Sequence, residues 1–186
     1  GEHTCGIDRD FMPVCWGFNW AGQSSPPELP MLELSSGSFH SCGIDLQGTV
    51  HCWGFNGLGQ ANPPEGVFFD VSAGNEHTCA LDESGSIHCW GSASNNLLLP
   101  PTGNFVQVAS GYSHSCALSS SGEAQCWGNN TSGESNPPQE QFVFLTAGAG
   151  YSCGVTQSRT IVCWGRTEFL GTDVSLNLWN GEYNCN

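Results

Sequence analysis

Apolar and polar residues alternate over short stretches of this chain, and Gly, Ser, Asn and Pro bound each stretch. In the segment 68–104, alternation runs over 68–73, 77–81 and 86–90, and the period of an amphipathic helix is missing. Gly85 lies between the last two stretches and supplies the positive φ that a tight hairpin turn needs. The pattern predicts an all-β protein whose segments each contribute three strands, the last two paired as a hairpin.

This pattern recurs at a constant interval of 37 residues, and cysteines mark the interval most clearly. The first cysteine of each repeat is Cys5, Cys42, Cys79, Cys116 or Cys153, and the second is Cys15, Cys52, Cys89, Cys126 or Cys163. A fixed period of this length is typical of repeat architectures, in which each unit buries its apolar surface against its neighbours. We therefore expect a single repeat domain, 1–186, with repeat motifs at 1–37, 38–74, 75–111, 112–148 and 149–186.

The two cysteines of each repeat are expected to face each other across the hairpin. If Leu81 faces Ile87, then Cys79 faces Cys89, and opposed Cα atoms in a non-hydrogen-bonded antiparallel pair lie about 4.5 Å apart, within disulfide range. A metal site is the alternative, but structural zinc prefers ligand pairs spaced by two to four residues, whereas nine residues separate each pair here. The sequence predicts one disulfide within each repeat and no metal.

A tryptophan follows each second cysteine, and neighbouring residues of a strand point to opposite faces of the sheet. The tryptophans are therefore expected to pack away from the disulfides, in space left by a small residue on the preceding strand. These pairs are Gly6 with Trp16, Gly43 with Trp53, Ala80 with Trp90, Ala117 with Trp127 and Gly154 with Trp164. We interpret the five tryptophans as core residues.

Charge and cysteine content limit the partners and the cellular compartment that we expect for the chain. Seventeen acidic residues face only three basic ones, Arg9, Arg159 and Arg166, for a net charge of −14. Binding to nucleic acid needs clustered Lys and Arg, so nucleic acid is not an expected partner. Eleven regularly spaced cysteines favour an oxidising compartment, and we expect a secreted or extracellular protein. No apolar run approaches the roughly 20 residues of a membrane span, and the start inside a motif suggests a piece of a longer precursor.

The segments "SAGNEHTCALDESGSIHCWG" and "ASGYSHSCALSSSGEAQCWG" resemble repeats of the regulator-of-chromosome-condensation superfamily. The cysteine-paired form is similar to the crinkly-type receptor ectodomains and to secreted bacterial and protist repeat proteins. The resemblance implies a β-propeller with one blade per repeat, usually seven blades in a ring. For five repeats we favour a closed five-bladed ring, because closure removes exposed sheet edges, with a strand near Val174–Leu178 completing the first blade. An arc of a larger array is the alternative.

Catalysis is not expected from this sequence. His3, His40, His77 and His114 recur at the repeat period, with Tyr151 in the fifth place, and a catalytic group has no reason to be copied onto four blades. We interpret these residues as half-buried hydrogen-bonding groups. A ring of imidazoles around a metal is the alternative, but it would require side chains of several blades to converge on one ion. The prediction is a protein that is not an enzyme and has no cofactor.

The segments that vary between repeats are the better candidates for binding, since the recurring residues are needed by the fold. The variable loops follow Cys-Trp-Gly, and loops at the same place in each blade are expected on one face. Their apolar residues are Phe18, Trp20, Phe55, Leu97, Leu98, Leu99, Phe169 and Leu170. Aromatic anchors among polar residues resemble protein interfaces. The alternative is that several of these side chains pack beneath the Pro-Pro turns.

Two functions fit these features. The first is a non-catalytic extracellular recognition module that binds a protein or glycan through the variable loops. The second is a structural repeat protein of a cell wall, extracellular fibre or appendage, which would bind further copies of itself. Asn129 and Asn130 are overlapping candidates for N-glycosylation, and the odd cysteine, Cys185, is expected to be unpaired or to bond another chain.

Overall fold

The computed structural model describes residues 2–166, and within this range all regular structure is β-strand apart from one 3-10 turn, Ser94–Asn96. The strands are β1 (His3–Ile7), β2 (Pro13–Gly17), β3 (Met31–Ser36), β4 (His40–Asp45), β5 (Val50–Gly54), β6 (Phe68–Ala73), β7 (His77–Asp82), β8 (Ile87–Gly91), β9 (Phe105–Ser110), β10 (His114–Ser119), β11 (Ala124–Gly128), β12 (Phe142–Ala147), β13 (Tyr151–Thr156) and β14 (Ile161–Gly165). The all-β prediction is confirmed.

The strands form five small antiparallel sheets that follow the 37-residue period. We call them blades: blade 1 is β1–β2, blade 2 is β3–β5, blade 3 is β6–β8, blade 4 is β9–β11 and blade 5 is β12–β14. In blades 2 to 5 the strand order follows the chain, so each blade is a three-stranded meander. Blade 1 has only two described strands, and β1 corresponds to the middle strand of the other blades. Within residues 2–166, one edge of β1 therefore has no partner strand, unlike the edges of the other middle strands.

Each blade carries a hairpin with the expected register. In blade 3, Leu81 lies opposite Ile87 and Cys79 opposite Cys89. The structure has a disulfide at the corresponding place in all five hairpins, with Cα atoms 4.0 to 4.1 Å apart. Each disulfide thus closes a loop of about ten residues within one repeat, which in the chain-entropy model contributes roughly 2–3 kcal/mol.

The hairpin turn keeps one backbone conformation whatever residue occupies it. Gly48, Gly85 and Gly122 have φ values of +82°, +77° and +88°. Phe11 and Arg159 stand at the equivalent positions of blades 1 and 5, and they adopt nearly the same conformation, with φ of +63° and +64°. A non-glycine residue is strained there, so the register of the flanking strands overrides local preference.

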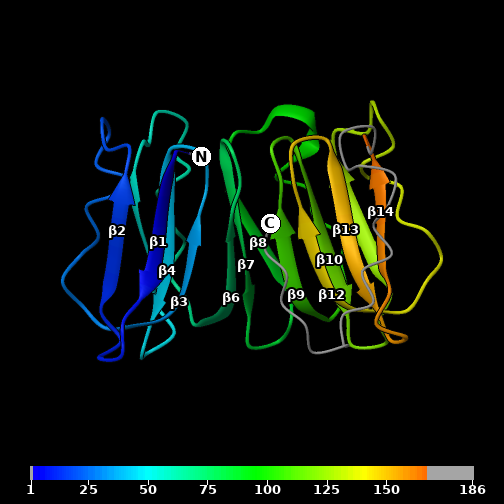
Figure 1. Ribbon diagram of the computed structural model, residues 1–186, viewed down its shortest axis with the longest axis horizontal. Helices are drawn as coiled ribbons and strands as arrows, with labels where there is room; N and C mark the ends of the chain where they lie inside the picture. Colours follow the sequence, from blue (N-terminus) through cyan, green and yellow to red (C-terminus); the bar gives the residue numbers. More distant parts are fainter. Residues whose placement is uncertain (1, 167–186) are drawn as a thin grey trace, which may run out of the picture.

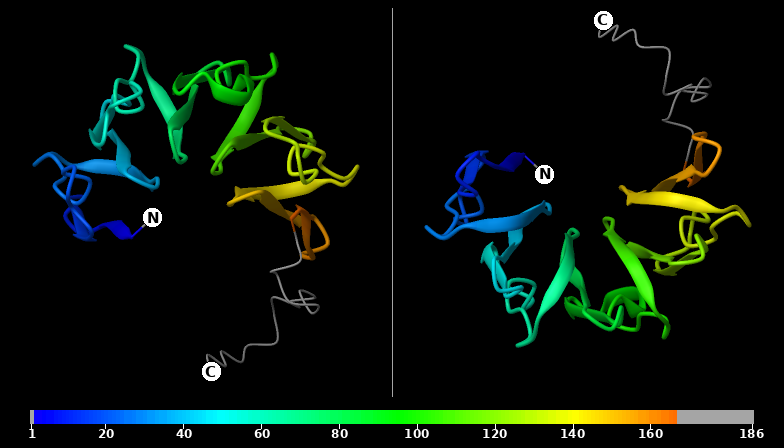
Figure 2. Two further views of the ribbon diagram at one scale, coloured as in Figure 1. Left: turned by 90° about the horizontal axis from the view of Figure 1, so that it is seen from above. Right: turned by 90° about the horizontal axis from the view of Figure 1, so that it is seen from below.

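The blades stand side by side with their strands roughly parallel (Figure 1), and seen along the strands they follow an arc around an open centre (Figure 2). The first strand of each complete blade lies innermost, and β3, β6, β9 and β12 contact one another in series. The hairpins lie toward the outside. This is the arrangement of blades in a propeller, and the predicted fold class is confirmed.

The core lies between blades rather than within them. The disulfide face of blade 3, with Cys79 and Leu81, packs against Phe105, Val108 and Trp127 of blade 4. The same division holds at the neighbouring interfaces, where the tryptophan of one blade covers the disulfide face of the blade before it. The predicted separation of tryptophan and disulfide onto opposite faces is thus confirmed.

The small residue on the middle strand serves a different purpose from the one we expected. A Cβ at Gly43 would collide with the side chains of Met31 and Leu34 on the inner strand, not with Trp53. In blade 5 the same holds for Gly154 beneath Phe142. The bulky residue comes from the inner strand because that strand crosses directly over the small position, which the hairpin pattern alone does not reveal. In blade 1, which has no described inner strand, no atom of residues 2–166 outside the immediate chain neighbours lies within 4 Å of the place where a Cβ of Gly6 would be.

The favoured closed ring is not formed by the described residues. Blade 1 and blade 5 are the two ends of an arc that remain apart in both views of Figure 2. The described part of the chain therefore has the alternative architecture, an arc. The strand predicted near Val174–Leu178 lies outside the described residues.

Candidate functional site

The loops after Cys-Trp-Gly in blades 1, 2 and 4 share a hydrogen-bonding frame built on one asparagine each. In blade 2, Asn56 Oδ1 accepts from the backbone N–H of Ala61, and its amide group donates to Asn62 Oδ1 at 2.7 Å. Asn19 and Asn130 make equivalent bonds in blades 1 and 4. Because side chains fix the frame, the residues between the frame positions are held in place and can vary, as a recognition loop requires.

A second frame residue links each loop to the next blade. Gln23, Gln60 and Glu134 are buried, and their backbone carbonyls accept from the indole Nε1–H of the next blade's tryptophan at 2.9 Å. Leu97 holds this place in blade 3, where it is only 2 % exposed and its carbonyl accepts from Trp127 at 3.0 Å. Leu97 is therefore not a surface residue, and its inclusion among the binding candidates was wrong. Its apolar side chain simply replaces a buried polar one.

Loops of blades 1 and 2 bring three aromatic rings together. The ring centroid of Trp20 lies 5.6 Å from that of Phe55 and 6.4 Å from that of Phe39, the latter in an edge-on arrangement. Trp20 remains 60 % exposed and Phe39 is 41 % exposed. We call Trp20, Phe39 and Phe55 the aromatic cluster. Such contacts hold large apolar side chains in fixed positions while leaving one face in water.

Sequence reasoning named Trp20 and Phe55 but missed Phe39. Phe39 precedes the periodic His40, and the residues at the same place in the other blades are Glu2, Glu76, Ser113 and Gly150. The signal that could have found it is this variation at a position adjacent to a repeated one. Its backbone carbonyl accepts from Phe55 N–H at 2.8 Å, which fixes the two residues side by side.

The other apolar loop candidates are spread along the arc. Phe18 is exposed on blade 1, and Leu99, at 69 %, is among the most exposed residues of the loop face, while Leu98 is half-buried. No ring contact joins Phe18 to the aromatic cluster. Phe169 and Leu170 lie outside the described residues. The structure thus gathers Trp20 and Phe55 into one place and leaves Phe18, Leu98 and Leu99 apart from it.

The periodic histidines form a ladder between blades, and they are more deeply buried than expected. His40 Nε2 lies 2.7 Å from the hydroxyl of Thr78 in the next blade, and His3, His77 and His114 make the same contact with Ser41, Ser115 and Ser152. The Thr78 hydroxyl donates its proton to the Gln60 carbonyl, so it accepts from His40. His40 therefore carries its proton on Nε2, and its Nδ1 is buried without a partner.

Burial keeps these imidazoles neutral. Loss of hydration lowers the pKa of His40 to about 4, and the pKa of His77 is lowered to about 4 for the same reason. Neighbouring imidazoles add to both shifts. A neutral, buried group that bonds the next blade joins blades together and has no free nitrogen reachable by a substrate. Among residues 2–166, no group of three or more His, Cys, Asp or Glu side chains could hold a metal ion.

A carboxyl pair links the inner strands of blades 2 and 3. Burial, together with the charge and hydrogen bond of Asp70, raises the pKa of Glu33 to about 8. Burial also raises the pKa of Asp70, which accepts from the backbone N–H of Val108 in blade 4 at 2.6 Å. The two carboxyl groups share a proton near neutral pH and act as an inter-blade contact.

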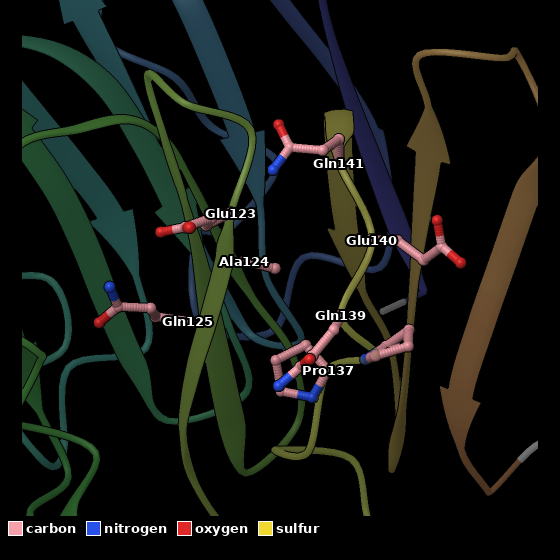
Figure 3. A pocket seen from close by; sticks show the side chains of 8 residues that line it. Glu123, Ala124, Gln125, Pro137, Gln139, Glu140 and Gln141 are labelled. Atoms are coloured by element: carbon pink, nitrogen blue, oxygen red, sulfur yellow. The ribbon is translucent and has the colours of Figure 1, made fainter.

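One groove of the described surface lies away from the aromatic cluster. It has a volume of about 530 Å³ and lies between β11 and the segment that leads to β12. Figure 3 shows Glu123 and Gln125 on one side and Glu140 and Gln141 on the other, with the two carboxylates pointing apart. Because its polar groups do not converge on one point, the groove lacks the arrangement of a small-molecule site.

The two glycosylation candidates lie in the loop of blade 4. The Asn130 amide group donates to Asn136 Oδ1 at 2.9 Å, and that of Asn129 donates to Glu134. Both nitrogens thus take part in the loop frame, and a glycan on either would replace one of these hydrogens. Modification remains a prediction. Cys185 lies outside the described residues.

Comparison with known proteins identifies the repeats. The family model of the regulator of chromosome condensation (RCC1) repeat matches residues 33–60, 70–96 and 105–134. Comparison with curated proteins gives no match. Within residues 2–166, no helix is long and apolar enough to cross a membrane.

Solved structures with this fold include two plant receptor-kinase ectodomains and yeast RCC1 (Prp20). The ectodomain of the Physcomitrella patens receptor kinase CR4 aligns with a TM-score of 0.78 at 24 % identity, covering 89 % of this chain and 49 % of that one. The CRINKLY ectodomain of the Arabidopsis thaliana receptor kinase ACR4 aligns with a TM-score of 0.72 at 28 % identity, covering 89 % and 60 %. Yeast RCC1 (Prp20), in its complex with Kap60, aligns with a TM-score of 0.75 at 17 % identity, covering 89 % and 54 %.

The chain thus spans between 49 % and 60 % of the length of these structures. The family match, the repeat period and the propeller neighbours agree with the resemblance seen in the sequence: three of the repeats are similar to RCC1 repeats, and the described blades have the propeller fold of these structures.

Proposed function

We propose that the chain is a non-catalytic recognition module of the extracellular space that binds a protein through its loop face. The aromatic cluster carries this proposal, because it joins three exposed or half-exposed rings from two blades on side-chain-braced loops. Aromatic anchors held in fixed positions are the residues that dominate binding energy at protein interfaces. The five disulfides and the similarity to receptor ectodomains support an extracellular setting.

A protein partner is proposed rather than a glycan. The structures similar to this chain include one in complex with a protein, Kap60, and one studied for its binding to Gsp1p and histones. The non-catalytic part of the proposal is supported by the histidines, since His40, His77 and His114 are fully buried in contacts between blades. Their role there is structural.

Site-specific photo-crosslinking tests the proposal. A photoreactive phenylalanine analogue at position 20 is exposed to the extracellular fraction of the producing organism, and the same analogue at position 83, on the opposite hairpin tip, is the matched control. We expect one protein adduct from position 20 and none from position 83. Excess wild-type chain should abolish the adduct, whereas excess Trp20→Ser, Phe55→Ser chain should not.

Three results would contradict the proposal: adducts of equal yield from both positions, no adduct from position 20, or equal competition by wild type and the double variant. Adducts made only with further copies of the same chain would favour the second candidate, a structural repeat protein. That candidate is supported by the apolar faces left exposed at both ends of the arc, where Trp16 and Phe144 lie.

A further inference from the structure

Two exposed carboxylates flank the aromatic cluster on the loop face. Glu2, Phe39 and Glu76 hold the same place in blades 1, 2 and 3, one residue before the periodic histidine. The backbone carbonyl of each accepts from the N–H of the first residue of the loop in its own blade, at 2.8 Å. All three residues are exposed. One carboxylate therefore lies on each side of Phe39 along the arc.

Both carboxylates also lie next to the loops that carry the other two rings of the cluster. The Glu2 carbonyl accepts from the N–H of Phe18, which begins the loop of blade 1. Glu76 borders the loop of blade 2, because a Cβ at Gly91 would lie 2.5 Å from the Glu76 carbonyl and 3.1 Å from Cβ of Gln60 in that loop. The backbone thus brings a carboxylate to each end of the aromatic cluster.

A groove begins beside the cluster and crosses blades 2 to 5. It has a volume of about 280 Å³ and is lined by the turns between inner and middle strands, at 36–38, 73–75, 110–112 and 147–149. We call it the turn groove. Its floor is continuous, since the N–H groups of Ser38, Asn75 and Tyr112 donate to a glycine carbonyl of the next blade at 3.0 to 3.3 Å. Phe39 directly follows Ser38, so the cluster stands at one end of the turn groove.

The turn groove suits an extended polypeptide. Most of its lining residues are Gly, Ser or Ala, which let a main chain approach the floor closely. The floor excludes larger side chains, because a Cβ at Gly74 would lie 2.5 Å from the Gly111 carbonyl. The groove also crosses four blades, a length that one side chain cannot fill.

The charge of this surface favours a basic ligand. The chain has 17 acidic residues and three arginines, and residues 10–158 contain neither Lys nor Arg. Arg9 and Arg159 lie in hairpin turns, at the opposite end of the strands from the loop face. An acidic surface attracts cationic partners, whereas a second copy of this chain offers few cations. The exposed face of Trp20 is also the ring type that binds a guanidinium or ammonium group best.

We propose that the protein partner presents a basic, extended segment to the loop face. Its main chain lies in the turn groove, and an arginine or lysine side chain stacks on the aromatic cluster between Glu2 and Glu76. The rings supply the cation–π contact, and the carboxylates pair with the same positive charge. This inference rests on the proposed recognition function and adds the chemistry of the partner.

Titration of the ¹⁵N-labelled full chain, followed by ¹H–¹⁵N correlation NMR, tests this with two synthetic peptides. One is a capped hexapeptide of alternating alanine and arginine, and the other carries citrulline, which is uncharged and of similar shape, in place of each arginine. We expect the arginine peptide to shift the Trp20 indole N–H and the amides of Gly74 and Gly111 until the sites are saturated. The citrulline peptide should leave these signals in place, and Trp20→Ser should weaken binding of the arginine peptide.

Two double variants separate local charge from net charge. Glu2→Gln with Glu76→Gln should weaken binding of the arginine peptide about fivefold. Glu83→Gln with Glu123→Gln is the matched control, because it removes the same charge from exposed residues at the hairpin turns, and it should change the affinity by less than about twofold. The spread of amide signals establishes that each variant folds.

Three results would overturn the proposal: equal shifts with both peptides, shifts that leave out Trp20 and the turn groove, or equal losses in the two double variants. If the photo-crosslinked adduct from position 20 still forms in such a case, the recognition function stands and only the basic partner is wrong. If no adduct forms but the arginine peptide binds as expected, the recognition function has failed and the basic ligand site stands.

Discussion

Trp16 and Trp90 occupy the same place in two copies of one hairpin, in blade 1 and blade 3, but their exposed fractions are 57 % and 8 %. Both hairpins have the same register and the same disulfide. The difference arises from the neighbour, because Trp90 packs on blade 2 and Trp16 has no described blade before it. In this molecule the hairpin is fixed within each repeat, whereas burial and most of the stability come from the interfaces between repeats.

The largest effect is expected from acid, which acts on the interior interfaces through the histidine ladder. The pKa of His40 and that of His77 are lowered from 6.5 to about 4 in the folded state, so stability is present above pH 6.5 and is lost as pH falls toward 4. The shift corresponds to roughly 3 kcal/mol for each imidazole. Urea unfolding between pH 7 and pH 4 measures the loss, and NMR titration assigns it. Imidazoles that titrate near 6.5 in the native state would contradict the ladder.

The second-largest effect on stability is expected from replacing the buried tryptophan, and the exposed one is the comparison. Trp90→Ala removes a buried ring and the bond to the Gln60 carbonyl, and should cost about 3–5 kcal/mol. Trp16→Ala, at the equivalent exposed place, should change the unfolding free energy by less than about 1 kcal/mol. Denaturant unfolding of dilute protein, at a concentration too low for association, compares the two. Similar losses in both variants would mean that blade 1 is covered in solution even in the monomer.

The glycine comparison is expected to be smaller. Gly154→Ala places a Cβ against the Phe142 ring, and overpacking of this kind usually costs about 1–3 kcal/mol. Gly6→Ala meets open space, and the lower entropy of the unfolded chain should make it neutral or slightly stabilising. Thermal unfolding of the two variants measures the difference. A loss at Gly6 equal to that at Gly154 would show that an inner strand covers blade 1.

The sequence alone was enough to predict the features that depend on the 37-residue period and on the hairpin. The register of Cys79 and Cys89 and the opposite directions of cysteine and tryptophan follow from the alternation of side chains along a strand. The packing of the inner strand over the small residue of the middle strand could not be predicted. Met31 reaches Gly43 because a bulge between Met31 and Glu33 shifts the register of the inner strand. Closure could not be predicted either, since the angle between blades is set by packing and not by repeat length.

The candidate site, too, could be predicted only in part from the sequence. Variation between loops pointed to Trp20 and Phe55, and the structure places their rings in contact. Leu97 was misjudged because an apolar residue in a variable loop reads as exposed, although its position is that of the buried Gln60. Phe39 was missed because it lies outside the loop segment and reaches the cluster only when two blades stand side by side.

The smallest expected effect concerns Glu33, which distinguishes one interior interface from another. Its pKa is raised from 4.5 to about 8, so the protonated pair with Asp70 stabilises the fold below pH 4.5, and this contribution is lost as pH rises through 8. Glu33→Gln introduces an amide group like that of Gln107, which lies at the interface between blades 4 and 5. There the Gln107 amide donates to the Leu145 carbonyl and accepts from the Leu145 N–H. The variant should lose this part of the pH dependence and melt about 2–4 °C higher at pH 8.

The reverse change gives the matched control for the carboxyl pair. Gln107→Glu places a half-buried carboxyl group on the inner strand of blade 4, at the position equivalent to Glu33, so it should steepen the loss of stability toward alkaline pH. Differential scanning calorimetry from pH 5 to pH 9 compares wild type and both variants. If Glu33→Gln melts at the wild-type temperature at every pH, the pair does not share a proton. The interface between blades 2 and 3 would then be held by its apolar packing and by the bonds of His40 to Thr78 and of Trp90 to the Gln60 carbonyl, without a contribution from the carboxyl pair.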